Sequence, residues 1–288
     1  MPSMAWPMTT ATVESQAQDT EISSPPPPVA QNPDSSLHLP RILCLHGGGT
    51  NARIFRTQCR VLRVWLAPYF RLVFADGPFF SRPGPDVESV YAEWGPFRSW
   101  IQPEFSHGSV GFRFEFLDNE AHVASIDRSI AAAMQEDDKL GATGKWIGLL
   151  GFSQGAKMAA SLLLRQQNQE ESKADRGRRS RTRDIDYRFA VLLAGRAPLI
   201  SMDIDMYSPF AAGLADSGIL GLPTIHVHGL RDAGIAMHRD LLHKCCEKGS
   251  TRLVEWDGDH RVPIKTKDVA PLVAEILAVA AEVGVLGH

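Results

Sequence analysis

The chain has 288 residues, of which 44% are hydrophobic and 22% are charged, a balance typical of a globular protein with a buried core. Its formal net charge of −3 argues against a nucleic-acid partner, which usually requires a basic face. No apolar run approaches the ~20 residues that cross a bilayer, and the N-terminus lacks the basic and apolar regions of a signal peptide. Cys44 falls in an expected core strand, and adjacent Cys245 and Cys246 rarely bridge each other, so a reducing compartment is favoured. We expect a soluble, cytoplasmic protein that contacts no membrane.

Residues 1–38 are polar and rich in proline, with four consecutive prolines at 25–28. Such a segment cannot bury enough apolar surface to offset its ordering entropy, so we expect a disordered tail. Residues 39–288 are then expected to form a single domain. It begins with a strand over 41–46, which runs directly into Gly47–Asn51. A helix over 52–68 and a strand over 71–75 follow.

The stretch from 77 to 118 has no clear periodicity and is rich in aromatic residues. Long irregular segments inside a compact domain tend to be functional, so we expect a lid or cap over the active site. Aromatic side chains there are expected to line an apolar pocket, and Phe79, Trp94 and Trp100 are the candidates for substrate contact. A helix is expected next, over 121–135.

The apolar run 146–150 is too short for an isolated helix and predicts a buried strand. It ends in Gly151–Gly155, a G-x-S-x-G sequence with Ser153 at its centre, and apolar residues then recur at helical spacing to about residue 167. A strand, a sharp turn carrying serine and a helix are the context of a nucleophile elbow. Gly151 and Gly155 suit it, because the residues two positions from the serine lie against neighbouring backbone.

After this helix, residues 169–186 are dense in charge, and we expect a flexible loop that contains the basic run 176–183. Strands are expected over 189–194, 223–228 and 252–256, with helices over 237–247 and 267–283. Strands that alternate with helices predict an α/β protein, with a mostly parallel sheet of about six strands and helices on both faces. The carboxyl ends of such strands meet at one edge, where ligands bind.

Candidates for an acid and a base follow two of the later strands. In α/β-hydrolases the order along the chain is serine, acid, histidine, so we assign Asp232 as the acid and His260 as the base for Ser153. Asp257 and Asp259 are alternative acids, but they stand too close to His260 in sequence to reach the far nitrogen of its ring. Asp76 is a further alternative that breaks the order.

The other histidines are given structural roles. His226 and His228 belong to a strand, and His46 is expected to anchor its glycine-rich loop by hydrogen bonds. A separate group lies on predicted helices away from the catalytic edge and comprises His122, His238 and His243.

An oxyanion hole requires two backbone N–H groups directed at one point. Gln154, the residue after the nucleophile, is expected to supply one. The second is expected from the glycine-rich loop, where Gly48 is the first choice and Gly49 the second, with the Gly49 backbone also close to the substrate. No metal and no organic cofactor are implied.

Taken together, the motifs resemble the fungal FSH-type serine hydrolases of the α/β-hydrolase superfamily. The resemblance is carried by Leu43–Asn51, Asp76–Pro78, Trp94–Trp100, Gly151–Gly155, His228–Asp232 and Gly258–His260. It spans about residues 40–283 and implies the same triad of Ser153, Asp232 and His260. Members similar to the releasing thioesterase of the lovastatin pathway imply a function in secondary metabolism, with an acyl carrier protein of a polyketide synthase as partner.

The expected function is therefore cleavage of acyl thioesters or esters through an acyl-enzyme, with release of a polyketide chain. The long aromatic lid favours a large apolar acyl group. A carboxylesterase that acts on small esters is the alternative among enzymes. From a different class, a non-catalytic binding protein with this fold remains an alternative.

Overall fold

The computed structural model describes residues 34–102, 120–175, 185–200, 202 and 218–287. Three expectations therefore fall wholly or partly outside the described residues: residues 1–33 of the tail, residues 103–119 of the lid and the whole basic run 176–183. Ser35–His288 forms one compact unit, which begins earlier than the expected residue 39. The carbonyl of Leu37 accepts a hydrogen bond from the Thr143 N–H (2.8 Å), so this segment is tied to the domain.

The central sheet has six strands, and every adjacent pair is parallel. In chain order they are β1 (Arg41–Leu45), β2 (Arg71–Ala75), β5 (Trp146–Phe152), β6 (Ile185–Leu193), β7 (Thr224–Gly229) and β8 (Thr251–Trp256). Across the sheet the order is β2-β1-β5-β6-β7-β8. This topology confirms the expected α/β-hydrolase architecture, and each predicted strand is present.

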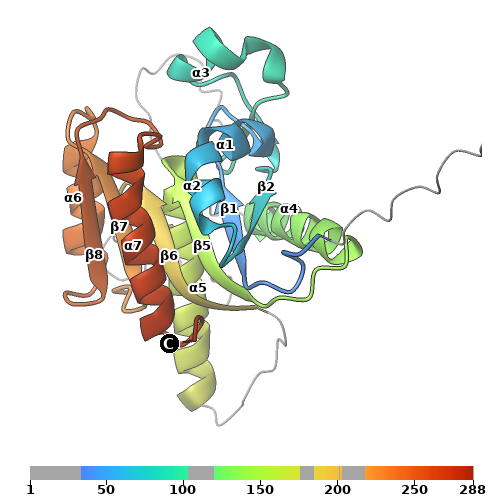
Figure 1. Ribbon diagram of the computed structural model, residues 1–288, viewed down its shortest axis with the longest axis vertical. Helices are drawn as coiled ribbons and strands as arrows, with labels where there is room; N and C mark the ends of the chain where they lie inside the picture. The colour runs from blue at the N-terminus through green and yellow to red at the C-terminus, as the bar shows by residue number, and fades with distance from the viewer. Residues whose placement is uncertain (1–33, 103–119, 176–184, 201, 203–217, 288) are drawn as a thin grey trace, which may run out of the picture. The chain divides into compact units, whose positions relative to one another are not determined.

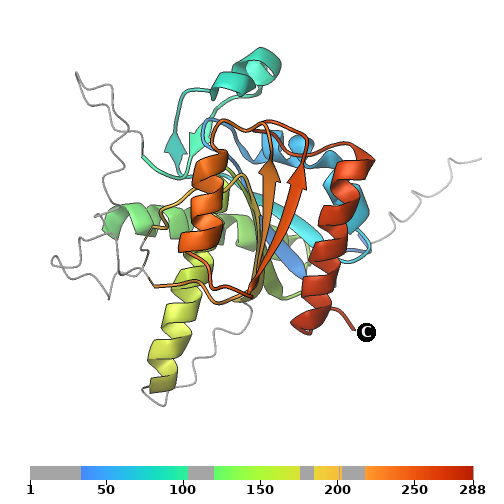
Figure 2. The same ribbon diagram turned by 90° about the vertical axis from the view of Figure 1, so that its left-hand side faces the viewer.

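Helices cover both faces of the sheet. They are α1 (Ala52–Gln58), α2 (Arg60–Leu66), α4 (Glu120–Lys139), α5 (Gln154–Asp175), α6 (Ile235–Lys244) and α7 (Thr266–Glu282). A further helix, α3 (Pro85–Tyr91), lies apart from the sheet (Figure 1). Figures 1 and 2 show α5 on one side of the sheet and α7 on the other. Buried side chains of α4 and α5 pack on the first face, whereas those of α1, α2 and α7 pack on the second.

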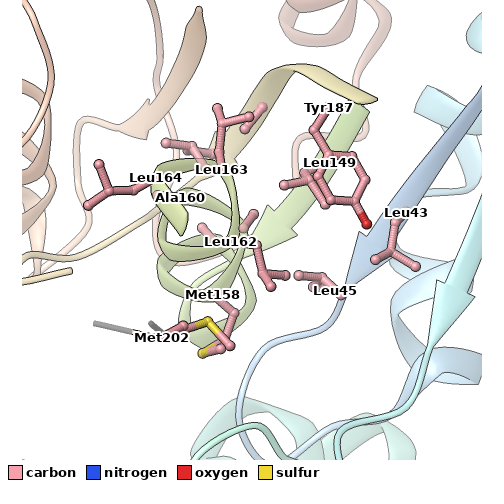
Figure 3. Close-up of a cluster of buried hydrophobic side chains, with 14 of the residues drawn as sticks. Leu43, Leu45, Leu149, Met158, Ala160, Leu162, Leu163, Leu164, Tyr187 and Met202 are labelled. Carbon is pink, nitrogen blue, oxygen red and sulfur yellow. The ribbon is translucent and has the colours of Figure 1, made fainter. Parts of the chain in front are cut away.

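Successive side chains of β1 point to opposite faces of the sheet and so belong to two different parts of the core. Leu43 and Leu45 join the cluster under α5, while Ile42 and Cys44 join the cluster under α7. Figure 3 shows Leu162 of α5 directed toward Leu45 in the first cluster. Burial on both faces explains why the central strands β1 and β5 are mainly apolar runs, whereas β8 at the edge of the sheet carries polar residues and is partly exposed.

Two predicted elements differ from the structure. The helix expected over 52–68 is divided at Cys59, which leaves helical geometry with ψ of 10° between α1 and α2. The loop expected over 169–186 was predicted too long at both ends, because α5 continues to Asp175 and β6 begins at Ile185. Glutamine and glutamate favour helix, so high charge density alone did not indicate a loop. Among the helices that the structure describes, none is both long and apolar enough to span a membrane.

The first part of the expected lid, residues 77–102, contains short regular elements. Strand β3 (Phe79–Phe80) pairs antiparallel with β4 (Arg98–Ser99), and α3 and the 3₁₀ helix η1 (Ala92–Trp94) lie between them in sequence. A backbone bridge between Thr50 and Arg98 joins this segment to the glycine-rich loop after β1. This segment, residues 77–102, called the cap segment or cap below, is therefore attached to the loop that follows β1.

Candidate active site

Ser153 sits in a strained turn between β5 and α5. Its φ of 53° is in the left-handed region, which non-glycine residues seldom adopt. A Cβ added to Gly151 would lie 2.2 Å from the carbonyl oxygen of Gly155, and one added to Gly155 would lie 2.0 Å from that of Leu45. The two glycines are thus required by backbone crowding, as the sequence predicts for a nucleophile elbow.

His260 bridges Ser153 and Asp232. Its Nε2 lies 2.9 Å from the Ser153 Oγ, and its Nδ1 lies 2.6 Å from the Asp232 Oδ2. Because an ionised carboxylate only accepts hydrogen bonds, the Nδ1–H donates to Asp232 and the Nε2 lone pair faces the serine hydroxyl. In this tautomer the ring can take the serine proton. The structure therefore brings together the three residues that the sequence predicts as a triad.

Asp232 is buried and held on both oxygens. Its Oδ1 accepts the Gly234 N–H at 2.7 Å, and its Oδ2 accepts the Nδ1–H of His260. Burial alone would raise the pKa of this carboxyl, but the hydrogen bonds from Gly234 and His260 outweigh burial and lower the pKa. Asp232 is consequently ionised at neutral pH.

The alternative acids have other partners. Asp257 pairs with Arg231, and Asp259 pairs with Arg261, in both cases at the exposed surface. Asp76 accepts the Ala52 N–H at the start of α1. These contacts leave Asp232 as the carboxylate on the ring of His260.

The two expected oxyanion donors are the backbone N–H groups of Gly48 and Gln154. Gln154 is the first residue of α5, and within the described residues neither its N–H nor that of Gly48 has a hydrogen-bond acceptor. The two residues are adjacent, since a Cβ on Gly48 would lie 3.3 Å from the Gln154 side chain. The positive end of the α5 dipole adds to this electropositive site. Both groups are therefore available to an oxyanion.

Gly49 does not fit the expectation. Its N–H donates to the Arg98 carbonyl at 2.9 Å, so it cannot serve as the second oxyanion donor. Its φ is 72°, and a Cβ there would lie 2.4 Å from the Gly84 nitrogen. Glycine at 49 is explained by close packing of the loop against the cap, and the expected substrate contact is corrected to this role.

His46 anchors the glycine-rich loop, as expected. Its Nε2 accepts the Gly77 N–H at 2.8 Å, and its Nδ1 lies 2.7 Å from the Gly47 carbonyl. Burial lowers the pKa of His46 to about 4, so the ring is neutral and its proton is on Nδ1, donated to Gly47.

Trp100 is wrongly predicted as a substrate contact. Its side chain is fully buried, and its Nε1–H donates to the His46 carbonyl at 2.9 Å. Phe79 and Trp94 are partly exposed. The Phe79 ring lies 5.3 Å from that of His122, and the Arg53 guanidinium lies 4.1 Å above the Trp94 ring. Substrate contact by Phe79 or Trp94 stays a prediction.

Two contributions were missed from the sequence. The Gln154 side chain accepts the Trp100 N–H at 2.8 Å, which ties the elbow to the cap. His238 was placed away from the site, yet its Nε2 is 3.7 Å from the Asp232 Oδ2. The sequence contains a weak signal for the role of His238. Helix α6 begins only three residues after Asp232, so a side chain in its first turn can lie near that carboxylate.

Comparison with known proteins gives the family. The profile of the serine hydrolase (FSH1) family matches residues 36–272, most of the chain. The chain belongs to the FSH1 serine hydrolase family. It is 57% identical over 259 residues to a probable esterase of Aspergillus terreus (88% of this chain, 94% of that protein). It is 52% identical over 272 residues to the esterase pigG of Monascus ruber (88% and 96%). Identity to the esterase citA of Monascus ruber is 48% over 262 residues (87% and 96%).

Membership of the FSH1 family gives the class of enzyme. The chain is a serine hydrolase with the α/β-hydrolase fold, as its motifs predict. The relatives named above are all called esterases, which agrees with ester hydrolysis as the general activity.

Proposed function

We propose that this FSH1 hydrolase cleaves acyl esters and thioesters through an acyl-enzyme on Ser153, with His260 as general base and Asp232 as its partner. One observation carries the proposal. The imidazole of His260 is hydrogen-bonded to the serine hydroxyl on one side and to a buried carboxylate on the other. A serine hydroxyl is a weak nucleophile at neutral pH unless such a base removes its proton.

In the first half of the reaction the Ser153 Oγ attacks the acyl carbon, and its proton passes to the His260 Nε2. The Asp232 carboxylate stabilises the imidazolium that forms. Negative charge develops on the carbonyl oxygen, where the N–H groups of Gly48 and Gln154 are available to stabilise it. The carbon–oxygen or carbon–sulfur bond then breaks, and the proton on His260 passes to the departing alcohol or thiol.

In the second half a water molecule attacks the acyl carbon of the ester on Ser153. His260 takes the proton of this water and returns it to the serine oxygen as the acyl–oxygen bond breaks. The products are the free acid and the regenerated serine. Every proton in this cycle moves through one imidazole.

We further propose that the natural acyl group is a polyketide held as a thioester on an acyl carrier protein. Carrier proteins are acidic, and α1 and α2, which follow the glycine-rich loop in sequence, present a row of exposed arginines. Arg53, Arg56 and Arg60 make up this row. A cytoplasmic location is part of the same proposal, and it is supported by the four free cysteines.

The first experiment is intact mass spectrometry after treatment with a fluorophosphonate, on wild type and on Ser153→Ala. We expect one adduct on wild type and none on the variant. Turnover of a matched acyl thioester and oxygen ester by both proteins follows, and Ser153→Ala is expected to lose at least about a thousandfold in kcat. An unlabelled, inactive wild type that is folded would favour the binding-protein alternative. A strong preference for the oxygen ester would favour the small-ester carboxylesterase.

A further inference from the structure

His238 is an unusual group to find in the core. It lies in the first turn of α6, and its side chain is fully buried. Among the residues that the structure describes, neither ring nitrogen has a hydrogen-bond partner, although Nε2 lies only 3.7 Å from the Asp232 Oδ2. A buried polar group without a partner costs free energy that an apolar side chain of the same size would not. The position therefore retains an imidazole at the expense of stability.

The charged and titratable groups that face His238 come from each element around it. The His228 ring on β7 lies 5.6 Å away and the His260 ring 6.1 Å away. Asp232 faces it from the loop before α6, and Arg196 faces it from the segment after β6. Burial, with the positive charge of Arg196 adding to its effect, lowers the pKa of His238 to about 4, so the ring is neutral at physiological pH.

A neutral imidazole carries one N–H, on either nitrogen. The ionised carboxylate of Asp232 favours the tautomer with the proton on Nε2, because that N–H then points at Oδ2. The distance of 3.7 Å is longer than a formed hydrogen bond, and a side-chain movement of less than about 1 Å would form one. Catalytic hydrogen bonds are often long in a resting enzyme and tighten along the reaction.

We propose that His238 is a positioning residue, whose Nε2–H is a second donor to the Asp232 Oδ2 and keeps that oxygen in line with the Nδ1 of His260. The Oδ1 atom is already fixed by the Gly234 N–H, whereas Oδ2 otherwise depends on His260 alone. His260 must exchange protons with the serine and then with the leaving group, and the second donor holds the carboxylate still while the ring does so. This inference rests on the proposed function of the triad.

The test compares three substitutions at His238 with one control. His238→Phe keeps the ring but removes the donor. His238→Asn places its amide N–H group near the position of the histidine Nδ1, which is out of reach of Asp232. His238→Gln places its amide N–H group near the position of Nε2, from which it can reach Asp232. His243→Phe is the matched control, since His243 lies on the same helix but is exposed.

We expect the full-length Phe and Asn variants to lose about tenfold in kcat on a p-nitrophenyl ester, with KM within about twofold of wild type. The acidic limb of the kcat/KM profile should move upward by roughly half a pH unit in both, because the Asp232 carboxylate loses a hydrogen-bond donor that favours its ionised form. The Gln variant should recover most of kcat, and the control should match wild type. The melting temperature of the Phe variant should stay the same or rise.

Wild-type kcat and an unchanged acidic limb in the Phe and Asn variants would overturn the proposal. So would an equal loss of kcat in the Asn and Gln variants. If the Phe variant did not fold, the contrast between Asn and Gln would still decide. Failure of the underlying triad would look different, because Ser153→Ala would then retain activity whatever residue stood at 238.

Discussion

At the scale of single residues, Gln154 joins three parts of the site. Its backbone N–H is free beside Ser153, its side chain lies against Gly48, and its Oε1 accepts the Trp100 N–H at 2.8 Å. The motif predicts the backbone role, because every nucleophile elbow places this residue at the start of the helix. The side-chain role depends on where the cap lies, which no local pattern in the sequence encodes.

We predict that Gln154→Met lowers the free energy of unfolding by roughly 1–3 kcal/mol, because a thioether leaves the buried Trp100 N–H without an acceptor. Chemical denaturation monitored by tryptophan fluorescence measures the change. Gln154→Glu is the matched control, since it keeps an oxygen at the same position and should lose less. A Met variant as stable as wild type would show that this contact does not hold the cap.

Residue type alone does not predict whether an aromatic side chain of this stretch lies in the core or at the surface. Trp100 and Phe80 both belong to an aromatic-rich stretch, yet Trp100 is fully buried and Phe80 is 68% exposed. An aromatic side chain suits a core and a pocket wall equally well, because both are apolar. Its location follows from the pairing of β3 with β4, which forms only when the chain folds.

At the scale of elements, α1 and α2 present the row of Arg53, Arg56 and Arg60. Arg53 and Arg56 are three residues apart on α1, so their side chains lie near one face of that helix, and Arg60 begins α2. Within the described part of the chain none of the three forms an ion pair, although Arg53 stacks on Trp94. Since α1 starts directly after the glycine-rich loop, Arg53 at the start of the row is the member nearest to that loop in sequence.

We predict that Arg56→Glu combined with Arg60→Glu raises KM for an acyl chain presented on its carrier protein by on the order of tenfold, because charge complementarity steers association. Turnover of the same acyl group on a small free thiol should be unchanged. The control carries the same change in charge at Lys139 and Lys145, which are exposed at the opposite edge of the sheet. Equal effects of both pairs, or an effect on the free thioester, would contradict docking at this row.

The elements themselves were largely predictable. All six strands of the sheet were predicted, and the central ones follow from apolar runs that a parallel sheet buried on both faces requires. The ends of α5 and the break at Cys59 were not, since helix length at a polar surface depends on small propensity differences and on neighbouring contacts.

At the scale of the whole molecule, four buried histidines give the fold a dependence on pH. Burial lowers the pKa of His46, His228 and His238 to about 4 and that of His226 to about 3. An unfolded histidine titrates near 6.5. Between these values the unfolded chain binds protons that the folded chain excludes, so the stability is complete above about pH 6.5 and is lost toward about pH 4. The lowered pKa of Asp232 acts in the same direction at still lower pH.

We predict that the free energy of unfolding falls between about pH 7 and about pH 5, by up to about 1.4 kcal/mol per pH unit for each of the four histidines. Urea denaturation across this range measures the slope. His226→Phe should reduce it, whereas His243→Phe, which changes an exposed ring, should not. A free energy that stays constant over this range would mean that these rings are protonated in the folded state.

The sequence by itself determined the class of fold, the serine elbow and the order of Ser153, Asp232 and His260. These follow from local causes: apolar runs that can only be buried strands, glycines demanded by backbone crowding, and loops that end strands at a shared edge. Only the tertiary structure decided that Gly49 holds the cap, that Trp100 is core and that His238 lies beside Asp232. Each of those depends on contacts between segments far apart in the chain, and these contacts are set by how helices and loops pack across the sheet.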